Sequence, residues 1–270
     1  MPVRLGLLVL LGALVAGCGS GPPTFASAQE AYTRGVEAFE AGKHGRAVEY
    51  LRTSLDFGRT SEIADDAQFL LAQAYAADGQ YLLAGTEFTR FIEFYRVDPR
   101  VERAAYERIQ AYAALSPRFE LDQTDTRQAL TYIALFLQQY PDGEYAVAAS
   151  DLADELREKL ARKQFEKGRL YERRELYEAA ALSYLGVLEE YPTSDYADDA
   201  LLGALRAQVD YAAGSLPGRQ EERYREATRI YDQLVSLFPE SPTLGDAQEL
   251  YDVAYQGWLS AGGEPTPASQ

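Results

Sequence analysis

Cysteine, histidine, methionine and tryptophan each occur only once in this chain of 270 residues. A single cysteine excludes an internal disulfide, and a single cysteine and a single histidine together are too few ligands for a typical zinc site. Basic residues are also scarce: 26 lysines and arginines stand against 42 acidic residues, for a formal net charge of −16. Because such a surface repels phosphate backbones, nucleic acid is excluded as a partner.

Catalytic motifs are missing as well. The sequence contains no G-x-S-x-G elbow, no phosphate-binding glycine loop and no H-E-x-x-H pair. The one histidine, His44, follows Gly42 and Lys43 and is expected in a surface turn. Adjacent carboxylates such as Asp65 and Asp66 are expected at solvated helix starts, where negative charge suits the helix dipole. We therefore expect a protein that is not an enzyme and holds no cofactor or metal.

The one long apolar run lies at the N-terminus. Residues 5–16 are apolar, follow Arg4, and are too few to span a bilayer as a stable helix, as in an export signal. The run ends in the letters VAGC at residues 15–18, which resemble a bacterial lipobox. Residues 1–17 are therefore predicted to be a lipoprotein signal peptide, with lipid attachment at Cys18. The alternative is an ordinary signal with a chance cysteine at its end.

Lipid on Cys18 would hold the protein on a membrane while its body stays in water. Gly19, not Asp, follows the cysteine and favours the periplasmic face of the outer membrane. Cleavage of the signal removes one positive charge, Arg4, so the formal charge changes from −16 to −17. Residues 18–27 are predicted to be a lipidated N-terminus and a tether rich in glycine, proline and serine.

The body of the chain repeats one helical pattern. Ala180, Tyr184 and Val187 stand at offsets 0, +4 and +7, which fall on one face of a helix, and Pro192 follows where it can end that helix. The same offsets recur in two further copies, Ala227-Tyr231-Leu234-Pro239 and Ala129-Ile133-Phe136-Pro141, and looser copies begin at Ala84 and Ala47. Five copies of one period predict a helical repeat protein.

These repeats predict an all-α fold: a tetratricopeptide-repeat (TPR) superhelix of about five helix-turn-helix units with a C-terminal capping helix. Units 1–3 are assigned to residues 28–143. A long linking helix, units 4–5 and the capping helix are assigned to residues 144–260, and residues 261–270 to a disordered tail. Residues 144–173 lack proline, so they are expected to form one long helix or two nearly continuous ones. The connector at 116–124 exceeds a normal repeat turn, as functional or mobile loops do.

Aromatic and amide side chains have the spacing of a peptide groove. Tyr32, Phe69 and Tyr106 lie 37 residues apart, each in the first helix of its unit. First helices line the concave face of a TPR superhelix, where rings offer apolar area and amides pair with a peptide backbone. The candidate groove consists of Tyr32, Val36, Phe39, Phe69, Gln73, Tyr106 and Gln110. The alternative is that these rings pack between neighbouring units.

The junctions between repeats carry a recurring motif, YPDGEYA at 140–146 and YPTSDYA at 191–197. Together with the lipobox, the length, the five units and the long linking helix, this motif resembles the BamD family, the TPR lipoproteins of the bacterial outer-membrane β-barrel assembly (BAM) machinery. The likeness covers roughly residues 29–238. The chain departs from the pattern at 56–57, where the first junction lacks Tyr-Pro, and at 214–218, where the fifth unit has an extra turn.

The resemblance implies a non-catalytic scaffold that promotes folding and insertion of outer-membrane proteins. Its C-terminal units would dock the periplasmic domain of a BamA-like β-barrel subunit, and its N-terminal groove would capture nascent outer-membrane proteins. Other BAM lipoproteins are further partners, and the lipid binds the membrane. Candidate docking residues are Arg173, Tyr184, Tyr211 and Tyr231, although several of these rings would serve equally well as core.

Two other functions stay open at this point. One is a periplasmic TPR adaptor of another envelope machine, such as cell-division or Tol-Pal coordination. Those relatives carry a coiled coil before the repeats and lack a lipobox, whereas only about ten residues separate Cys18 from the first helix here. The other is a lipoprotein enzyme or nutrient receptor, for which 270 residues leave no room for a second domain.

Overall fold

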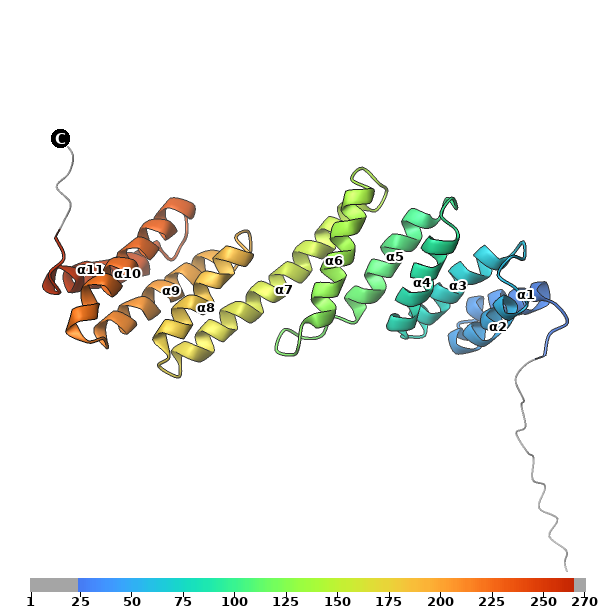
Figure 1. Cartoon of the computed structure of the whole chain (residues 1–270), viewed down its shortest axis with the longest axis horizontal. Coiled ribbons are helices and arrows are strands. Elements are labelled where there is room, and N and C mark those ends of the chain that lie inside the picture. Colours follow the sequence, from blue (N-terminus) through green and yellow to red (C-terminus); the bar gives the residue numbers. More distant parts are fainter. Residues whose placement is uncertain (1–23, 265–270) are drawn as a thin grey trace, which may run out of the picture. The chain divides into compact units, whose positions relative to one another are not determined.

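The computed structural model describes residues 24–264, which form eleven α-helices and no strand (Figure 1). The predicted signal peptide and Cys18 lie outside these residues, as do the first part of the tether and the last part of the tail. The all-α tetratricopeptide fold is confirmed. The helices are α1 Ala28–Glu40, α2 His44–Asp56, α3 Ala64–Ala77, α4 Tyr81–Phe94, α5 Val101–Ala114, α6 Thr124–Gln139, α7 Ala146–Glu172, α8 Tyr177–Glu190, α9 Ala197–Ala213, α10 Pro217–Leu237 and α11 Leu244–Ser260.

The described residues form two compact units, one up to residue 78 with α1 to α3 and one from residue 79 onward with α4 to α11. In the first unit α1 begins at the cap Ser27, whose side chain accepts a hydrogen bond from the Glu30 amide at 3.1 Å. Helices α1 and α2 form a hairpin, and α3 packs on α2. The Ser54 hydroxyl of α2 donates to the Ala28 carbonyl at 2.9 Å, which ties the end of α2 to the start of α1.

In the second unit each helix packs on the next one along the chain, from α4 to α11. The buried side chains form two clusters. One joins α5, α6 and the first half of α7, and includes Ile109, Ile133 and Leu156. The other joins the second half of α7 with α8 to α11, and includes Tyr184 and Leu205. Helix α7 therefore belongs to both cores.

Helix α7 is one continuous helix of 27 residues, which settles the choice between one helix and two. At 1.5 Å per residue it is about 40 Å long. Ala149, Ala153 and Leu156 face the first core, and Ala161 faces the second. The turn before α10 ends at Pro217, which is the first residue of that helix. A proline is well suited to the first helical position.

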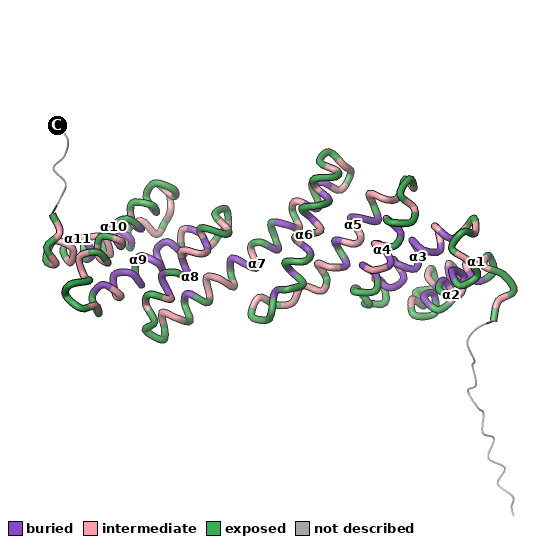
Figure 2. Tube along the Cα trace, in the orientation of Figure 1, coloured by how far each residue is buried: buried purple, intermediate pink, exposed green. Residues whose placement is uncertain are grey.

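The repeat pattern found in the sequence marks the buried faces of the helices (Figure 2). Ala180, Tyr184 and Val187 of α8 are at most 2% exposed, and the matching positions of α2, α4 and α6 are buried as well. The exception is Tyr231 of α10, which is half-buried. The offsets of four and seven thus correctly identified the core-facing stripe.

Candidate docking site

The turn between α7 and α8 differs from the corresponding turns of the chain. Residues 173–176 connect the two helices, and the Tyr171 carbonyl accepts hydrogen bonds from the Arg174 and Leu176 amides, each at 3.0 Å. Glu175 has a φ of 59°, whereas the turns after α1 and α3 place glycines there, Gly42 at 69° and Gly79 at 74°. A non-glycine residue in this left-handed region is strained by roughly 1–3 kcal/mol, and such residues concentrate at functional sites.

Replacement of Glu175 by glycine is expected to stabilise the folded chain. The substitution relieves the left-handed strain but adds freedom to the unfolded chain, so we expect a net gain of about 1 kcal/mol. Thermal unfolding of Glu175→Gly measures the gain. Arg174→Gly in the same turn is the control, because it adds chain freedom without relieving strain, and it should lower the melting temperature. A Glu175→Gly variant no more stable than the unaltered chain would show that the turn holds no strain.

A cavity of about 490 Å³ lies beside this turn, between it and the turn that joins α9 to α10. Leu176 and Tyr177 form one side, and Asp210, Tyr211 and Arg223 form the other. The Arg223 guanidinium lies 3.8 Å from the centre of the Tyr211 ring and also donates to the Ser215 hydroxyl. The cavity thus has apolar, aromatic and charged walls, as binding pockets for side chains do.

The charge around this cavity is mixed. Burial raises the pKa of Asp210, the nearby carboxylate of Glu172 adds to the rise, and Arg206 opposes it. Burial, and then a side-chain hydrogen bond with the Glu178 carboxylate, raise the pKa of Tyr211. In the turn, Arg173 and Arg174 are exposed and form no ion pair with other described residues. They place two free cations on a strongly acidic protein.

Exposed apolar side chains adjoin the same cavity. Leu176, in its wall, is 50% exposed, and Leu216, directly after the lining residue Ser215, is 78% exposed. Exposed leucines beside a cavity and two unpaired arginines are the composition of a protein interface, in which a buried apolar contact is ringed by charge.

Behind the turn, Tyr184 and Glu172 form a partly buried link between α7, α8 and α9. The Tyr184 hydroxyl donates to the Glu172 carboxylate at 2.7 Å, and Arg206 lies 3.6 Å from the other carboxylate oxygen. The Tyr184 ring lies between Gly168 and Gly203, where an added Cβ would come within 2.6 Å and 2.9 Å of it. Burial, and then Glu172, raise the pKa of Tyr184. This link fixes the last turn of α7, from which the α7–α8 turn starts.

The four predicted docking residues take different places. Arg173 is exposed at the end of α7, and Tyr211 lines the cavity. Tyr184 is 2% exposed, so it belongs to the core. It can affect a partner only indirectly, by positioning residues that contact the partner. Tyr231 is half-buried, and its ring lies 4.5 Å from that of Tyr251 of α11.

The seven predicted groove residues divide between the two compact units. Tyr32, Val36 and Phe39 are half-buried on α1, and on α3 Gln73 is half-buried while Phe69 is only 6% exposed. In the second unit Gln110 is exposed. Tyr106 stacks on Tyr145 with 4.8 Å between ring centres, so this ring packs against a neighbouring segment as the alternative supposed.

Sequence reasoning missed Glu175, Leu176 and Arg223. A signal for the first was available: the turns after α1 and α3 each contain glycine, whereas residues 173–176 contain none. Arg223 and Leu176 come together only through the packing of α8 on α9 and α9 on α10, which no spacing in the sequence reveals.

Within residues 24–264 no group of three or more histidine, cysteine or acidic side chains has the arrangement of a metal site. Over the same residues, no helix combines the length and the apolar character that a membrane crossing requires.

The comparisons with known proteins come from sequence and from structure. The family described as YfiO, outer membrane lipoprotein, matches residues 25–215. The outer membrane protein assembly factor BamD of Caulobacter vibrioides is 28% identical over 207 residues, 74% of this chain and 68% of that protein. The same factor of Haemophilus influenzae is 25% identical over 197 residues, 68% of this chain and 75% of that protein. A solved TPR repeats protein of Bacteroides fragilis is 13% identical, with a TM-score of 0.47 over 86% of this chain and 99% of that one.

Proposed function

Because the chain belongs to the YfiO family of outer membrane lipoproteins, we propose that it is a scaffold of the machinery that assembles outer-membrane proteins. The observation that carries this proposal is the family match over residues 25–215, together with two relatives that are both outer membrane protein assembly factors. The alternative of an adaptor for cell division or Tol-Pal coordination is not favoured. In this proposal the protein is a scaffold that holds other polypeptides, and it is not an enzyme.

We propose that the α7–α8 turn and its cavity dock the periplasmic domain of the barrel-forming, BamA-like subunit. Three features support the assignment: the unpaired Arg173 and Arg174, the exposed Leu176, and the strained Glu175. The complementary partner surface would bring a carboxylate to the arginines and an apolar side chain to Leu176.

We further propose that the N-terminal unit captures nascent outer-membrane proteins. The half-buried Tyr32, Val36 and Phe39 share one helix, α1, and leave part of their apolar surface in solvent. An extended or helical peptide would cover that surface. Phe69, which is buried, would support the site from within. Other lipoproteins of the machinery are further partners in this proposal.

The proposed lipid on Cys18 makes the function testable in cells. A strain whose only copy has residues 1–18 replaced by a cleavable export signal without a lipobox is expected to hold the protein in the soluble periplasmic fraction, since the absence of acyl chains removes its membrane affinity. Outer-membrane β-barrel proteins should then fall to a small fraction of their normal amount, as measured in purified outer membranes. The unaltered gene in the same strain is the control. Normal barrel levels after complete depletion of the protein would refute the assembly function.

A further inference from the structure

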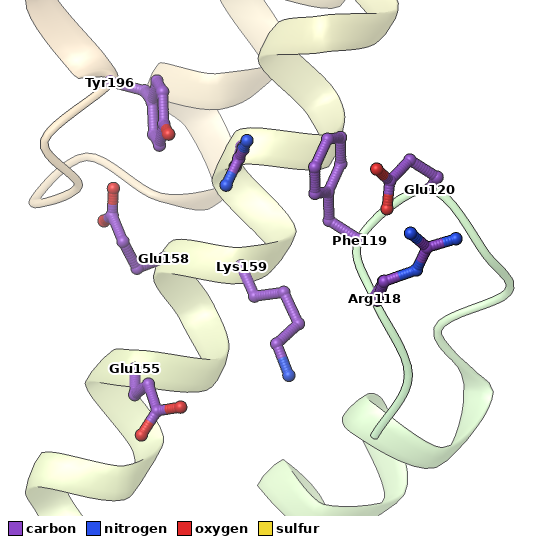
Figure 3. Close-up of a pocket in the computed structure, with 8 residues that line it drawn as sticks. Arg118, Phe119, Glu120, Glu155, Glu158, Lys159 and Tyr196 are labelled. Atoms are coloured by element: carbon purple, nitrogen blue, oxygen red, sulfur yellow. The ribbon is translucent and has the colours of Figure 1, made fainter. Parts of the chain in front are cut away.

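A trough crosses the middle of α7, away from the docking turn. It consists of two adjoining cavities of about 580 Å³ and 780 Å³ that share Glu155 and Glu158. Figure 3 shows the first cavity, with the connector residues Arg118 and Phe119 on one side of α7 and Tyr196 on the other. The second cavity continues along α7 to the junction at 190–195 between α8 and α9.

The connector that forms one wall of the trough is held in a fixed shape. Lys163 of α7 donates to the carbonyl oxygens of Phe119, Glu120 and Leu121 at 3.0, 3.3 and 2.8 Å. The buried amide of Gln123 donates to the carbonyl oxygens of Arg118 and Leu121 at 2.9 and 3.0 Å. A long loop fixed by this many hydrogen bonds presents a prepared wall, so a ligand would not have to order it on binding.

Charge is distributed unevenly along the trough. The first cavity is balanced, with the cations Arg118, Lys159 and Arg162 against three carboxylates. The second is acidic: it is lined by Asp154, Glu155, Glu158, Glu190 and Asp195, and its one cation, Arg157, pairs with Asp154 at 2.9 Å. A ligand that enters the second cavity therefore meets uncompensated negative charge.

Glu158 stands where the two cavities join. One of its carboxylate oxygens accepts the Asp195 amide at 3.2 Å, and the other is buried with no hydrogen-bond partner among the described residues. Burial raises the pKa of Glu158, the hydrogen bond from the Asp195 amide opposes the rise, and the charge of the Asp195 carboxylate adds to it. Burying a carboxylate oxygen without a hydrogen-bond partner destabilises the folded chain unless a cation compensates the charge.

We propose that this trough binds an extended, basic segment of a partner polypeptide, with one lysine or arginine side chain paired to Glu158. Two cavities in line suit successive side chains of an extended chain, and Phe119, Tyr191 and Tyr196 supply apolar contact. The acidic second cavity selects the basic side chain and repels an acidic one. Glu158 lies 14 residues before the end of α7, about 20 Å along the helix, so this site is separate from the proposed docking turn.

Binding of two short, fluorescent synthetic peptides to the purified protein tests the proposal. Both are blocked at their ends and alternate a charged residue with leucine and serine; one carries lysine and the other glutamate. Glu158→Gln removes the charge but keeps an oxygen for the Asp195 amide. Thr193→Trp fills the second cavity. Asp151→Asn is the control, because Asp151 is exposed on the same helix and lines neither cavity.

The lysine peptide is expected to bind the unaltered protein and Asp151→Asn equally. It should bind Glu158→Gln and Thr193→Trp about tenfold more weakly, the scale of one lost charge-assisted contact. The glutamate peptide should not bind. If either trough variant binds the lysine peptide as the control does, or if the two peptides bind alike, the proposal is wrong.

Stability separates this result from misfolding. A carboxyl whose pKa is raised in the folded chain contributes stability below its ordinary value of 4.5, and that contribution is lost as the pH rises through the raised value. At neutral pH the charged Glu158 therefore destabilises the fold, and Glu158→Gln should melt at a higher temperature than the unaltered protein. A variant that is more stable and yet binds more weakly cannot owe its weakness to unfolding.

Discussion

Leu176→Glu is expected to weaken binding of the barrel-forming subunit's periplasmic domain by at least about tenfold while the protein stays folded. Leu176 is 50% exposed in the wall of the cavity, so its replacement leaves the core untouched. In the proposed complex the side chain would be buried, and a carboxylate there would lose the apolar contact and bury an unpaired charge. Calorimetric titration of the two purified proteins measures the change.

A second surface variant tells the two proposed sites apart. Phe39→Ala, in the first compact unit, should leave docking of the barrel-forming subunit unchanged and weaken binding of C-terminal peptides from outer-membrane proteins. Leu176→Glu should show the reverse. Equal loss of both activities in both variants would indicate a general disturbance of the fold. Unchanged docking in Leu176→Glu would remove the α7–α8 turn from the interface.

Tyr184→Ala is expected to destabilise the second unit by about 3–5 kcal/mol, the usual cost of removing a fully buried aromatic ring. The ring lies between Gly168 and Gly203, so no neighbouring Cβ is available to fill the cavity that is left. For a unit of this size, the change corresponds to a fall of roughly 10 °C in melting temperature. Thermal unfolding followed by circular dichroism provides the measurement.

Tyr184→Phe isolates the hydrogen bond from the packing. It keeps the ring and removes only the hydroxyl that donates to Glu172, so the expected cost is about 1.5–3 kcal/mol, the range for a hydrogen bond to a charged group. If Tyr184→Ala costs no more than Tyr184→Phe, the ring does not pack as described. Because Tyr184 is buried, a folded variant at this position should weaken docking only if the α7–α8 turn is displaced.

Much of the fold could be predicted from the sequence because the residues that a helix buries recur with the period of the helix. The offsets of Ala180, Tyr184 and Val187 identified buried positions in the other copies as well, with Tyr231 as the exception, and the absence of proline across 144–173 indicated the long α7. The prediction of docking residues was less successful, because tyrosine rings serve both in the core and at binding surfaces. Tyr184 was named as a docking residue although its offset already placed it on the core stripe.

The candidate sites were harder to predict because they depend on contacts between distant segments. The docking cavity needs Leu176 and Arg223, which are 47 positions apart in sequence, and the trough needs the connector to lie on α7 through Lys163. Single leucines, arginines and lysines are common on protein surfaces, so nothing in the local sequence distinguishes Leu176, Arg223 or Lys163. The length of the connector was the one local clue to the trough.

Photo-crosslinking from position 176 in intact cells tests the central claim most directly. A photoreactive amino acid replaces Leu176 in the full-length protein, and another replaces Val147, a more exposed apolar residue near the start of α7. We predict that irradiation links position 176, and not position 147, to a large β-barrel protein of the outer membrane. Crosslinks to that protein from neither position, or from 147 alone, would contradict a docking site at the α7–α8 turn.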